Sequence, residues 1–144
     1  MTDPVYLVDT NILVYAYDTS DLFKHEVSSE LFEEFFSGKK KFSICLQNLT
    51  EFFKVATEKM QNKMSNEEAT LLITDLISLS SLKKIHYRES TLLKSLEIER
   101  MFRIHFWDAL IAATMIENGI FHIYTENVKD FNKIPGIITV NPFE

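Results

Sequence analysis

The chain has 144 residues, of which 46% are apolar, and its formal net charge is -6 at neutral pH. This length and apolar content suffice for one sizeable hydrophobic core, so we expect a single domain spanning residues 1–144. Three glycines and three prolines leave little material for flexible linkers. The only cysteine, Cys45, lies in an apolar stretch, which predicts a buried strand residue in a reducing compartment rather than a disulfide.

The sequence gives no indication of secretion or membrane insertion. Asp3 and Asp9 interrupt the first apolar stretch, so a signal peptide is not expected there. No run of about 18 apolar residues is present that could span a bilayer. We therefore expect a soluble, cytoplasmic protein.

The negative net charge argues against nucleic-acid binding over a broad basic surface, because such binding depends on releasing counterions from phosphates. This argument weakens if several acidic residues surround divalent cations, since bound cations reverse the sign of the local field. The arrangement of the acidic residues is therefore decisive for function.

Predicted strands and helices alternate along the whole chain. The apolar run at residues 5–8, which ends at Asp9, is typical of a strand buried on both faces of a parallel sheet. Helical periodicity and helix-end signals predict helices at residues 11–17, 22–36, 46–60, 65–79, 90–101 and 106–118. Four further strands are predicted at residues 41–45, 82–87, 121–124 and 137–140. This alternation predicts an α/β sandwich around a mainly parallel sheet of about five strands.

Acidic residues follow the predicted strands at positions suited to a shared site. Asp9 ends the first strand, Glu51 lies early in the helix after the second, and Asp108 lies early in the helix that begins near Phe106. Residues 124–131 add polar groups after the fourth strand. If the strands are parallel neighbours, these segments meet at the carboxyl edge of the sheet, where α/β proteins bind ligands.

Each of these acids also has a structural interpretation. Asp9 suits a helix cap, Glu51 suits the exposed flank of an amphipathic helix, and Asp108 suits the first turn of a helix. Asp9 is the hardest to dismiss, because a charge beside a buried apolar run is costly without a partner. Clustered carboxylates repel one another unless a cation compensates, and Mg²⁺ or Mn²⁺ takes such oxygen ligands.

Four segments together resemble the PIN-domain family. Residues 5–13 resemble its opening strand and Asp-Thr-Asn signature, residues 47–52 its second motif, and residues 106–113 followed by Gly119 its third. The closing segments, 124–127 and 140–143, are similar to the VapC-like branch, the toxins of bacterial and archaeal toxin–antitoxin pairs. The resemblance covers essentially the whole chain, in the expected order.

This resemblance implies a Rossmann-like α/β/α fold and a ribonuclease that depends on Mg²⁺ or Mn²⁺. It also implies an RNA substrate, frequent homodimers and inhibition by a cognate antitoxin. Asp9, Glu51 and Asp108 fall on the three principal acids of the family. The phenylalanines at positions 32, 35 and 36, together with Phe52 and Phe53, exceed what a domain of this size must bury, so we expect some of them in a homodimer contact or an antitoxin groove.

Asn127 departs from the family pattern, because related sequences usually carry aspartate there. An amide oxygen can ligate a metal but adds no charge, and Asp130, about one helical turn later, is a candidate for the missing carboxylate. We therefore expect one strong metal site and at most one weak one. Thr125 matches the hydroxyl residue before the fourth acid of the family. Expected partners that orient carboxylates and water are Thr10, Asn11 and Thr125.

The mechanistic hypothesis places a cation on Asp9 and Asp108, with Glu51 as a further ligand or as the base for the attacking water. Arg103 and His105, just before Asp108, are the best candidates for contacting RNA phosphate. Trp107 is a candidate for base stacking, but its place in the helix favours core packing.

Two other functions compete with this hypothesis. A degenerate PIN module that binds RNA or a protein without cleaving is favoured by Asn127 and disfavoured by the presence of all three principal acids. A phosphotransfer enzyme of the haloacid-dehalogenase kind also begins with a strand and an aspartate. Its chemistry needs a second acid two residues after the first, where this chain has Asn11.

Overall fold

The computed structural model describes residues 3–144 and contains a five-stranded parallel sheet. The strand order is β3-β2-β1-β4-β5, and each neighbouring pair is parallel. The strands are β1 (Val5–Val8), β2 (Lys41–Cys45), β3 (Leu82–Ile85), β4 (His122–Tyr124) and β5 (Ile138–Val140).

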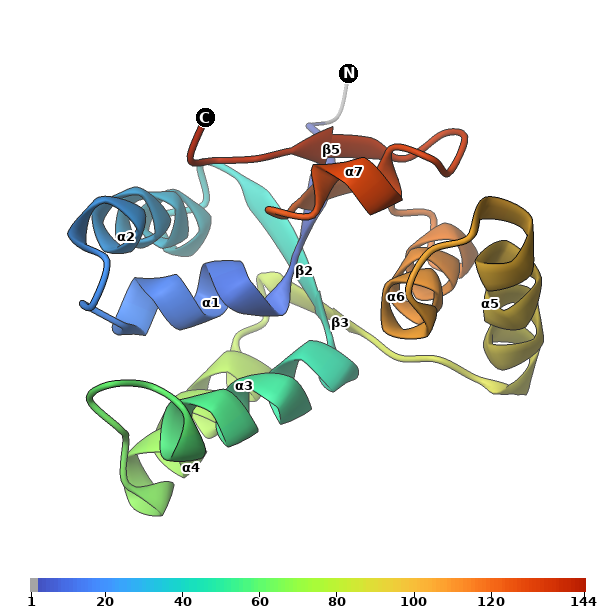
Figure 1. Cartoon of the computed structure of the whole chain (residues 1–144). Helices are drawn as coiled ribbons and strands as arrows, with labels where there is room; N and C mark the ends of the chain where they lie inside the picture. Colours follow the sequence, from blue (N-terminus) through green and yellow to red (C-terminus); the bar gives the residue numbers. More distant parts are fainter. Residues whose placement is uncertain (1–2) are drawn as a thin grey trace.

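Helices cover both faces of this sheet, as Figure 1 shows. They are α1 (Thr10–Tyr17), α2 (Leu22–Phe36), α3 (Leu46–Glu58), α4 (Asn66–Ser78), α5 (Glu89–Phe102), α6 (Phe106–Glu117) and α7 (Val128–Phe131). Helices α1 to α4 lie on one face, whereas α5 and α6 lie on the other (Figure 1). The predicted Rossmann-like α/β/α sandwich is confirmed.

The alternation of side chains along each strand divides the core into two halves. Val8 packs with α1, α2 and α3 on one face, whereas its neighbour Leu7 packs with α6 on the other. Both residues are fully buried, because every central strand of a parallel sheet is covered on both sides. Burying this apolar area on two faces is the main stabilising contribution to the fold.

The element bounds agree with the sequence prediction to within one residue, with three larger differences. The third strand ends at Ile85, two residues before the predicted end. The helix predicted at 46–60 ends at Glu58, although Met60 is still buried. The short helix α7 was not predicted, because four residues are too few to show a helical period. Gly119 follows α6 with a φ of 70° and ends that helix as predicted, since glycine adopts this conformation readily.

The chain order changes direction beside β1, and this positions the candidate site. From β1 the chain builds outward through β2 to β3, and it later returns to the other side of β1 with β4 and β5. Ligand sites of open α/β sheets lie at this kind of switch point, at the carboxyl ends of the strands. None of the helices between residues 3 and 144 has the length and apolar sequence needed to cross a bilayer.

Candidate active site

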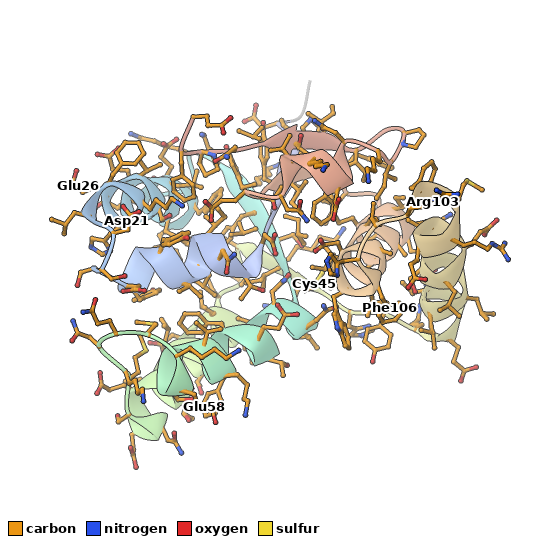
Figure 2. All side chains as sticks on the ribbon, in the orientation of Figure 1. Asp21, Glu26, Cys45, Glu58, Arg103 and Phe106 are labelled. Carbon is orange, nitrogen blue, oxygen red and sulfur yellow. The ribbon has the colours of Figure 1, made fainter. Side chains whose placement is uncertain are left out.

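The amino ends of α1, α3 and α6 converge at the carboxyl edge of the sheet (Figure 1). Each of these helices carries or follows one of the three predicted acids. In Figure 2, Cys45 marks the junction of β2 and α3, and Phe106 marks the start of α6. The structure therefore brings Asp9, Glu51 and Asp108 to one edge, where their charges act on one another.

Asp9 is held by hydrogen bonds from two directions. Its Oδ1 accepts from the backbone N–H of Thr10 (2.8 Å), and its Oδ2 accepts from the Thr125 hydroxyl (2.8 Å). Its own N–H donates to the carbonyl of Tyr124, which extends the pairing of β1 with β4. Burial raises the pKa of Asp9, and the charge of Glu51 adds to this rise, while the two hydrogen bonds oppose it. Asp9 thus caps α1, as its structural interpretation predicts, and also directs its carboxylate into the shared site.

Glu51 is fixed by donors from two helices. The Thr10 hydroxyl donates to its Oε2 (2.8 Å), and the Gln47 amide donates to its Oε1 (3.0 Å). The Asn48 amide donates in turn to the Thr10 hydroxyl (2.9 Å), and Asn48 is fully buried. This chain of donors ties the start of α1 to the start of α3 and orients the Glu51 carboxylate.

Asp108 lies in the first turn of α6 and meets the segment after β4. The Asn127 amide nitrogen donates to Asp108 Oδ2 (2.6 Å) and to Asp130 Oδ2 (3.2 Å). Burial, the charge of Asp9 and the charge of Asp130 raise the pKa of Asp108 to about 6, against the hydrogen bond from Asn127. Asn127 therefore bridges the two carboxylates with which it was predicted to share a metal site.

The three principal acids lack a cationic side chain to balance them. Among the described residues, no Lys, Arg or His forms a salt bridge with Asp9, Glu51 or Asp108. The nearby acids Glu126 and Asp130 do have such partners, Lys24 at 2.6 Å and Lys133 at 3.8 Å. The site consequently carries negative charge that no salt bridge among the described residues balances, which favours a bound cation.

The donor set fits a hard divalent ion better than a closed metal cage. Between residues 3 and 144, no three His, Cys, Asp or Glu side chains are grouped tightly enough to enclose one ion. Mg²⁺ keeps several waters and commonly binds proteins through one or two carboxylates, so a loose arrangement of oxygen ligands suits it. The side chains that hydrogen-bond with the three acids are amides and hydroxyls, and carboxylate, amide and hydroxyl oxygens are ligands that Mg²⁺ and Mn²⁺ take.

Of the remaining predicted site residues, some contact the acids and others do not. Thr10 and Thr125 orient carboxylates, as expected for residues in these positions. Asn11 is exposed, and within the described residues its side chain makes no hydrogen bond, so the expectation that it orients a carboxylate receives no support. Arg103 and His105 are both exposed, and His105 lies close enough to Asp108 to lower its pKa.

The sequence analysis missed two residues of this site. Gln47 and Asn48 belong to the second motif that the resemblance quoted, but neither was assigned a role. The signal available in the sequence was an asparagine placed three residues after a strand end, between the apolar residues Leu46 and Leu49 in a helix that packs on the sheet. A buried amide in such a position requires hydrogen-bond partners, and the structure provides them through Thr10 and the Cys45 backbone N–H.

The predicted excess of aromatic side chains is largely absorbed by the core. Phe32, Phe35 and Phe52 are buried, and Phe35 stacks on Phe42 with ring centroids 4.4 Å apart. Phe36 alone among the phenylalanines of this α2 face is exposed. Burial removes Phe32, Phe35 and Phe52 from any partner contact. The expectation that some of these phenylalanines lie in a homodimer contact or an antitoxin groove stays a prediction for the exposed Phe36 and the half-buried Phe53.

Two other predictions for single residues have opposite outcomes. Cys45 is buried at the end of β2 as predicted, and burial raises the pKa of its thiol to about 12, which excludes a reactive thiolate. Trp107 was predicted to pack in the core, but 59% of its surface is exposed. The next residue, Asp108, points toward the site, and adjacent residues of a helix point in different directions.

The donor chain through Thr10 predicts a measurable stability effect. Thr10→Val is expected to lower the free energy of unfolding by about 1–3 kcal/mol, because the buried Asn48 amide loses its acceptor. Urea unfolding measures this difference. The matched control is Thr74→Val on α4, where an exposed hydroxyl donates only to its own helix, and it should change stability by less than about 0.5 kcal/mol. Equal effects in both variants would contradict a structural role for the chain.

Several solved structures share this fold. A toxin–antitoxin complex from Klebsiella pneumoniae is 24% identical, with a TM-score of 0.64 and coverage of 96% of this chain and 98% of that chain. VapBC2 from Rickettsia felis, bound to a DNA fragment from its promoter, is 22% identical, with a TM-score of 0.67 and coverage of 94% and 97%. VapC20 from Mycobacterium tuberculosis, a toxin that cleaves the sarcin–ricin loop, is 16% identical, with a TM-score of 0.66 and coverage of 89% and 92%.

Comparison of sequences gives the family. Among curated proteins, none is significantly similar to this chain. The model of the PIN domain family, however, matches residues 6–137, a range that contains all three principal acids and the segment after β4. The chain therefore belongs to the PIN domain family.

Proposed function

We propose that this protein is a ribonuclease that depends on Mg²⁺ or Mn²⁺ and hydrolyses RNA phosphodiester bonds. The observation that carries the proposal is the meeting of Asp9, Glu51 and Asp108 at the switch point of the sheet, where none of the three forms a salt bridge with a described residue. Buried acids that raise each other's pKa are costly to the fold. Such an arrangement is expected where a functional ligand compensates the charge.

Asp9 and Asp108 are the proposed ligands of the principal cation. Their carboxylates come from opposite sides of the site, one at the end of β1 and one in α6. When bound, a divalent ion offsets the charge of the substrate phosphate and makes a neighbouring water a stronger nucleophile. Asn127 and Asp130 are the proposed weaker ligands, and the hydrogen bonds between them must rearrange for both to serve.

The chain's own residues supply orientation and proton transfer. Thr125 and the backbone of Thr10 hold Asp9, while Thr10 and Gln47 hold Glu51. In the proposed reaction, a water oxygen forms a bond to phosphorus, the opposite P–O bond breaks, and Glu51 accepts a proton from the water. Fixed donors behind both carboxylates reduce the reorganisation needed during this step.

Contacts to the RNA backbone are proposed for the positive groups near α6. His105 precedes α6 and Arg103 ends α5, and both side chains are exposed. Arg103 adopts the left-handed conformation, with a φ of 55°, which is uncommon for a residue other than glycine. With a net charge of -6, the protein depends on such local contacts and on bound cations to attract phosphate.

The biological role that we propose is the toxin of a toxin–antitoxin pair that acts in the cytoplasm. Its support is the likeness in fold to toxin–antitoxin complexes over nearly the full length of both chains. We further propose a homodimer, supported by the exposed leucines of α5, which are Leu92, Leu93 and Leu96. Sedimentation of the wild type and of a Leu93→Glu variant tests the homodimer, since one charge in such a contact should shift the protein to monomers.

A binding module without catalysis is the second candidate. The observation that favours it is the position of Asn127. Its neutral amide lies between Asp108 and Asp130 and donates a hydrogen bond to each. This second candidate predicts RNA binding that does not require a divalent ion and produces no cleavage. Protein that is folded, free of antitoxin and inactive on several RNA classes would establish this second function in place of the first.

Analysis of the product ends tests the proposed chemistry. Mass spectrometry of cleaved RNA should show hydrolysed ends without a 2′,3′-cyclic phosphate, because water and not the ribose 2′-hydroxyl attacks the phosphorus. Cleavage should also cease with EDTA. A cyclic phosphate at the product ends, or cleavage that persists with the chelator, would contradict the proposal and indicate attack by the 2′-hydroxyl or a contaminating nuclease.

Asn127→Asp is expected to change the response to metal in a defined direction. A third carboxylate beside Asp108 and Asp130 replaces two hydrogen bonds by repulsion, so the metal-free variant should be less stable than the wild type by about 1–2 kcal/mol. Mn²⁺ should stabilise the variant more than the wild type, because the added charge strengthens binding. Thermal unfolding with and without Mn²⁺ measures both effects. Asn62→Asp, in an exposed loop, controls for net charge, and an equal Mn²⁺ response in the two variants would refute the prediction.

A further inference from the structure

A cavity of about 580 Å³ opens beside Glu51. It lies between the start of α3, the connection from β3 to α5 and the start of α6. The residues of its lining that bear on a ligand are Gln47, Thr50, Glu51, His86, Tyr87 and Trp107. The volume falls in the range of pockets that bind small organic groups, and the presence of Glu51 makes the cavity continuous with the proposed active site.

Two exposed aromatic side chains line this cavity. Trp107 is the only tryptophan of the chain and is 59% exposed, and Tyr87 is 51% exposed. Trp107 directly precedes Asp108, so the helix turn that presents a proposed metal ligand also presents the indole ring. Large aromatic rings left open to water at a cavity offer flat surfaces for stacking, which every nucleobase accepts.

Acceptor oxygens of α3 line the side of the cavity next to Glu51, while His86, Tyr87 and Trp107 add groups that can donate. The Gln47 amide nitrogen is engaged with Glu51, which leaves its Oε1 to accept. The Thr50 hydroxyl donates to the carbonyl of Leu46, which leaves its lone pairs to accept. A carboxylate and acceptor oxygens repel phosphate, whereas they complement the exocyclic amino group of adenine, cytosine or guanine. The acceptors and donors of the cavity together suit the edge of a base, and the acceptors next to Glu51 disfavour a phosphate at that point.

We propose that this cavity binds one unpaired base of the RNA substrate, stacked on Trp107 next to the scissile phosphate. This inference rests on the proposed ribonuclease function and adds where the substrate is held. Glu51 lines the cavity, and its charge also acts on Asp9, so a base in the cavity would adjoin a phosphate at the proposed cation, as neighbouring parts of one nucleotide do. Enzymes that take a base out of its stack hold it in this way, by stacking and by hydrogen bonds to its edge.

Fluorescence of the single tryptophan tests the stacking directly. The protein for this titration is the Asp9→Asn variant, in which we expect cleavage to be blocked, and the probe is a single-stranded oligoribonucleotide with Mg²⁺ present. Saturable quenching of Trp107 is expected, and an oligonucleotide of the same length with abasic sites should bind at least ten-fold more weakly and quench little. Equal quenching and equal affinity for both oligonucleotides would overturn the proposal, because the backbone alone would then account for binding.

Cleavage by cavity variants provides the second test. Trp107→Ala should raise KM by about ten-fold or more with a smaller change in kcat, and Trp107→Phe, which retains a flat ring, should recover most of the loss. Phe121→Ala is the matched control. Phe121 is also exposed, but it lies just before the amino end of β4, whereas the site lies at the carboxyl ends of the strands. The control variant should cleave like the wild type.

The outcomes separate this proposal from the function on which it rests. Metal-dependent cleavage by the wild type together with unchanged KM in Trp107→Ala would overturn the base site and leave the ribonuclease function intact. Absence of cleavage by the wild type would remove the ribonuclease function. Conversion of a dimer to monomers by Trp107→Ala, with the abasic oligonucleotide bound normally, would overturn the proposal in favour of a contact between two copies of the chain.

Discussion

Asp108→Asn is expected to lower the rate of RNA cleavage by at least about 100-fold, while the protein remains folded. The substitution removes one negative charge from the proposed cation site and retains the shape of the side chain. Its oxygen can still accept the hydrogen bond that Asn127 donates to Asp108. Single-turnover cleavage of a fluorescent RNA with Mg²⁺ or Mn²⁺ measures the effect, and Asp9→Asn should give a loss of similar size.

The matched control is Asp75→Asn, which makes the same chemical change at an exposed position of α4. It should retain the activity of the wild type. Activity within a few-fold of the wild type in both Asp108→Asn and Asp9→Asn would show that the acidic edge is structural. Asp9 would then serve only as the cap of α1, through its hydrogen bond with the Thr10 backbone.

The same Asp108→Asn substitution is expected to stabilise the metal-free protein near pH 8. In the folded state the pKa of Asp108 is about 6, against an ordinary value of 3.8, chiefly because of burial and the charge of Asp9. Above pH 6 the folded protein must hold a charge that the unfolded chain solvates more easily. This difference corresponds to roughly 3 kcal/mol, and solvent screening of a partly exposed group reduces the expected gain to about 1–2 kcal/mol.

The pH dependence of this gain has a definite sign. As pH falls from 7 to 4, the folded wild type takes up a proton at Asp108 before the unfolded chain does, so its disadvantage against the variant shrinks and is absent below about pH 4. Chemical unfolding in EDTA at several pH values measures the difference. A variant that is less stable than the wild type at pH 8, or a difference that grows toward pH 4, would contradict this account.

Divalent ions should reverse the order of stability. Mg²⁺ or Mn²⁺ binds the folded wild type and stabilises it by mass action, whereas the variant lacks one of the proposed ligands. The variant is therefore expected to be more stable than the wild type in EDTA. Added Mg²⁺ or Mn²⁺ should raise its free energy of unfolding less than that of the wild type. This crossing of stabilities is independent of any assay of RNA cleavage.

The position of the acidic edge was predictable because it follows from a few local signals. The apolar run that ends at Asp9 predicts a central parallel strand, and parallel strands place their carboxyl ends together. Glu51 comes early in α3, which follows β2, and Asp108 comes early in α6, which precedes β4. The chain order thus places all three acids at one edge before any contact is known.

Features that depend on the direction of single side chains were not predictable in this way. Trp107 belongs to a strongly apolar helix, so periodicity favours the core, yet its ring is exposed, whereas every residue of α6 from Ala109 to Met115 is buried. The role of Asn48 required knowing that Thr10 lies across from it in space. Both outcomes depend on packing between segments far apart in the sequence.

The most direct test of the central claim is cleavage of a mixed-sequence fluorescent RNA by the purified wild-type protein, with Mg²⁺ or Mn²⁺ and with EDTA. We expect cleavage that requires the divalent ion and is lost when Asp9 or Asp108 is replaced by asparagine. RNA that stays intact with both metals and across several RNA classes, with protein shown to be folded and free of antitoxin, would contradict the central claim.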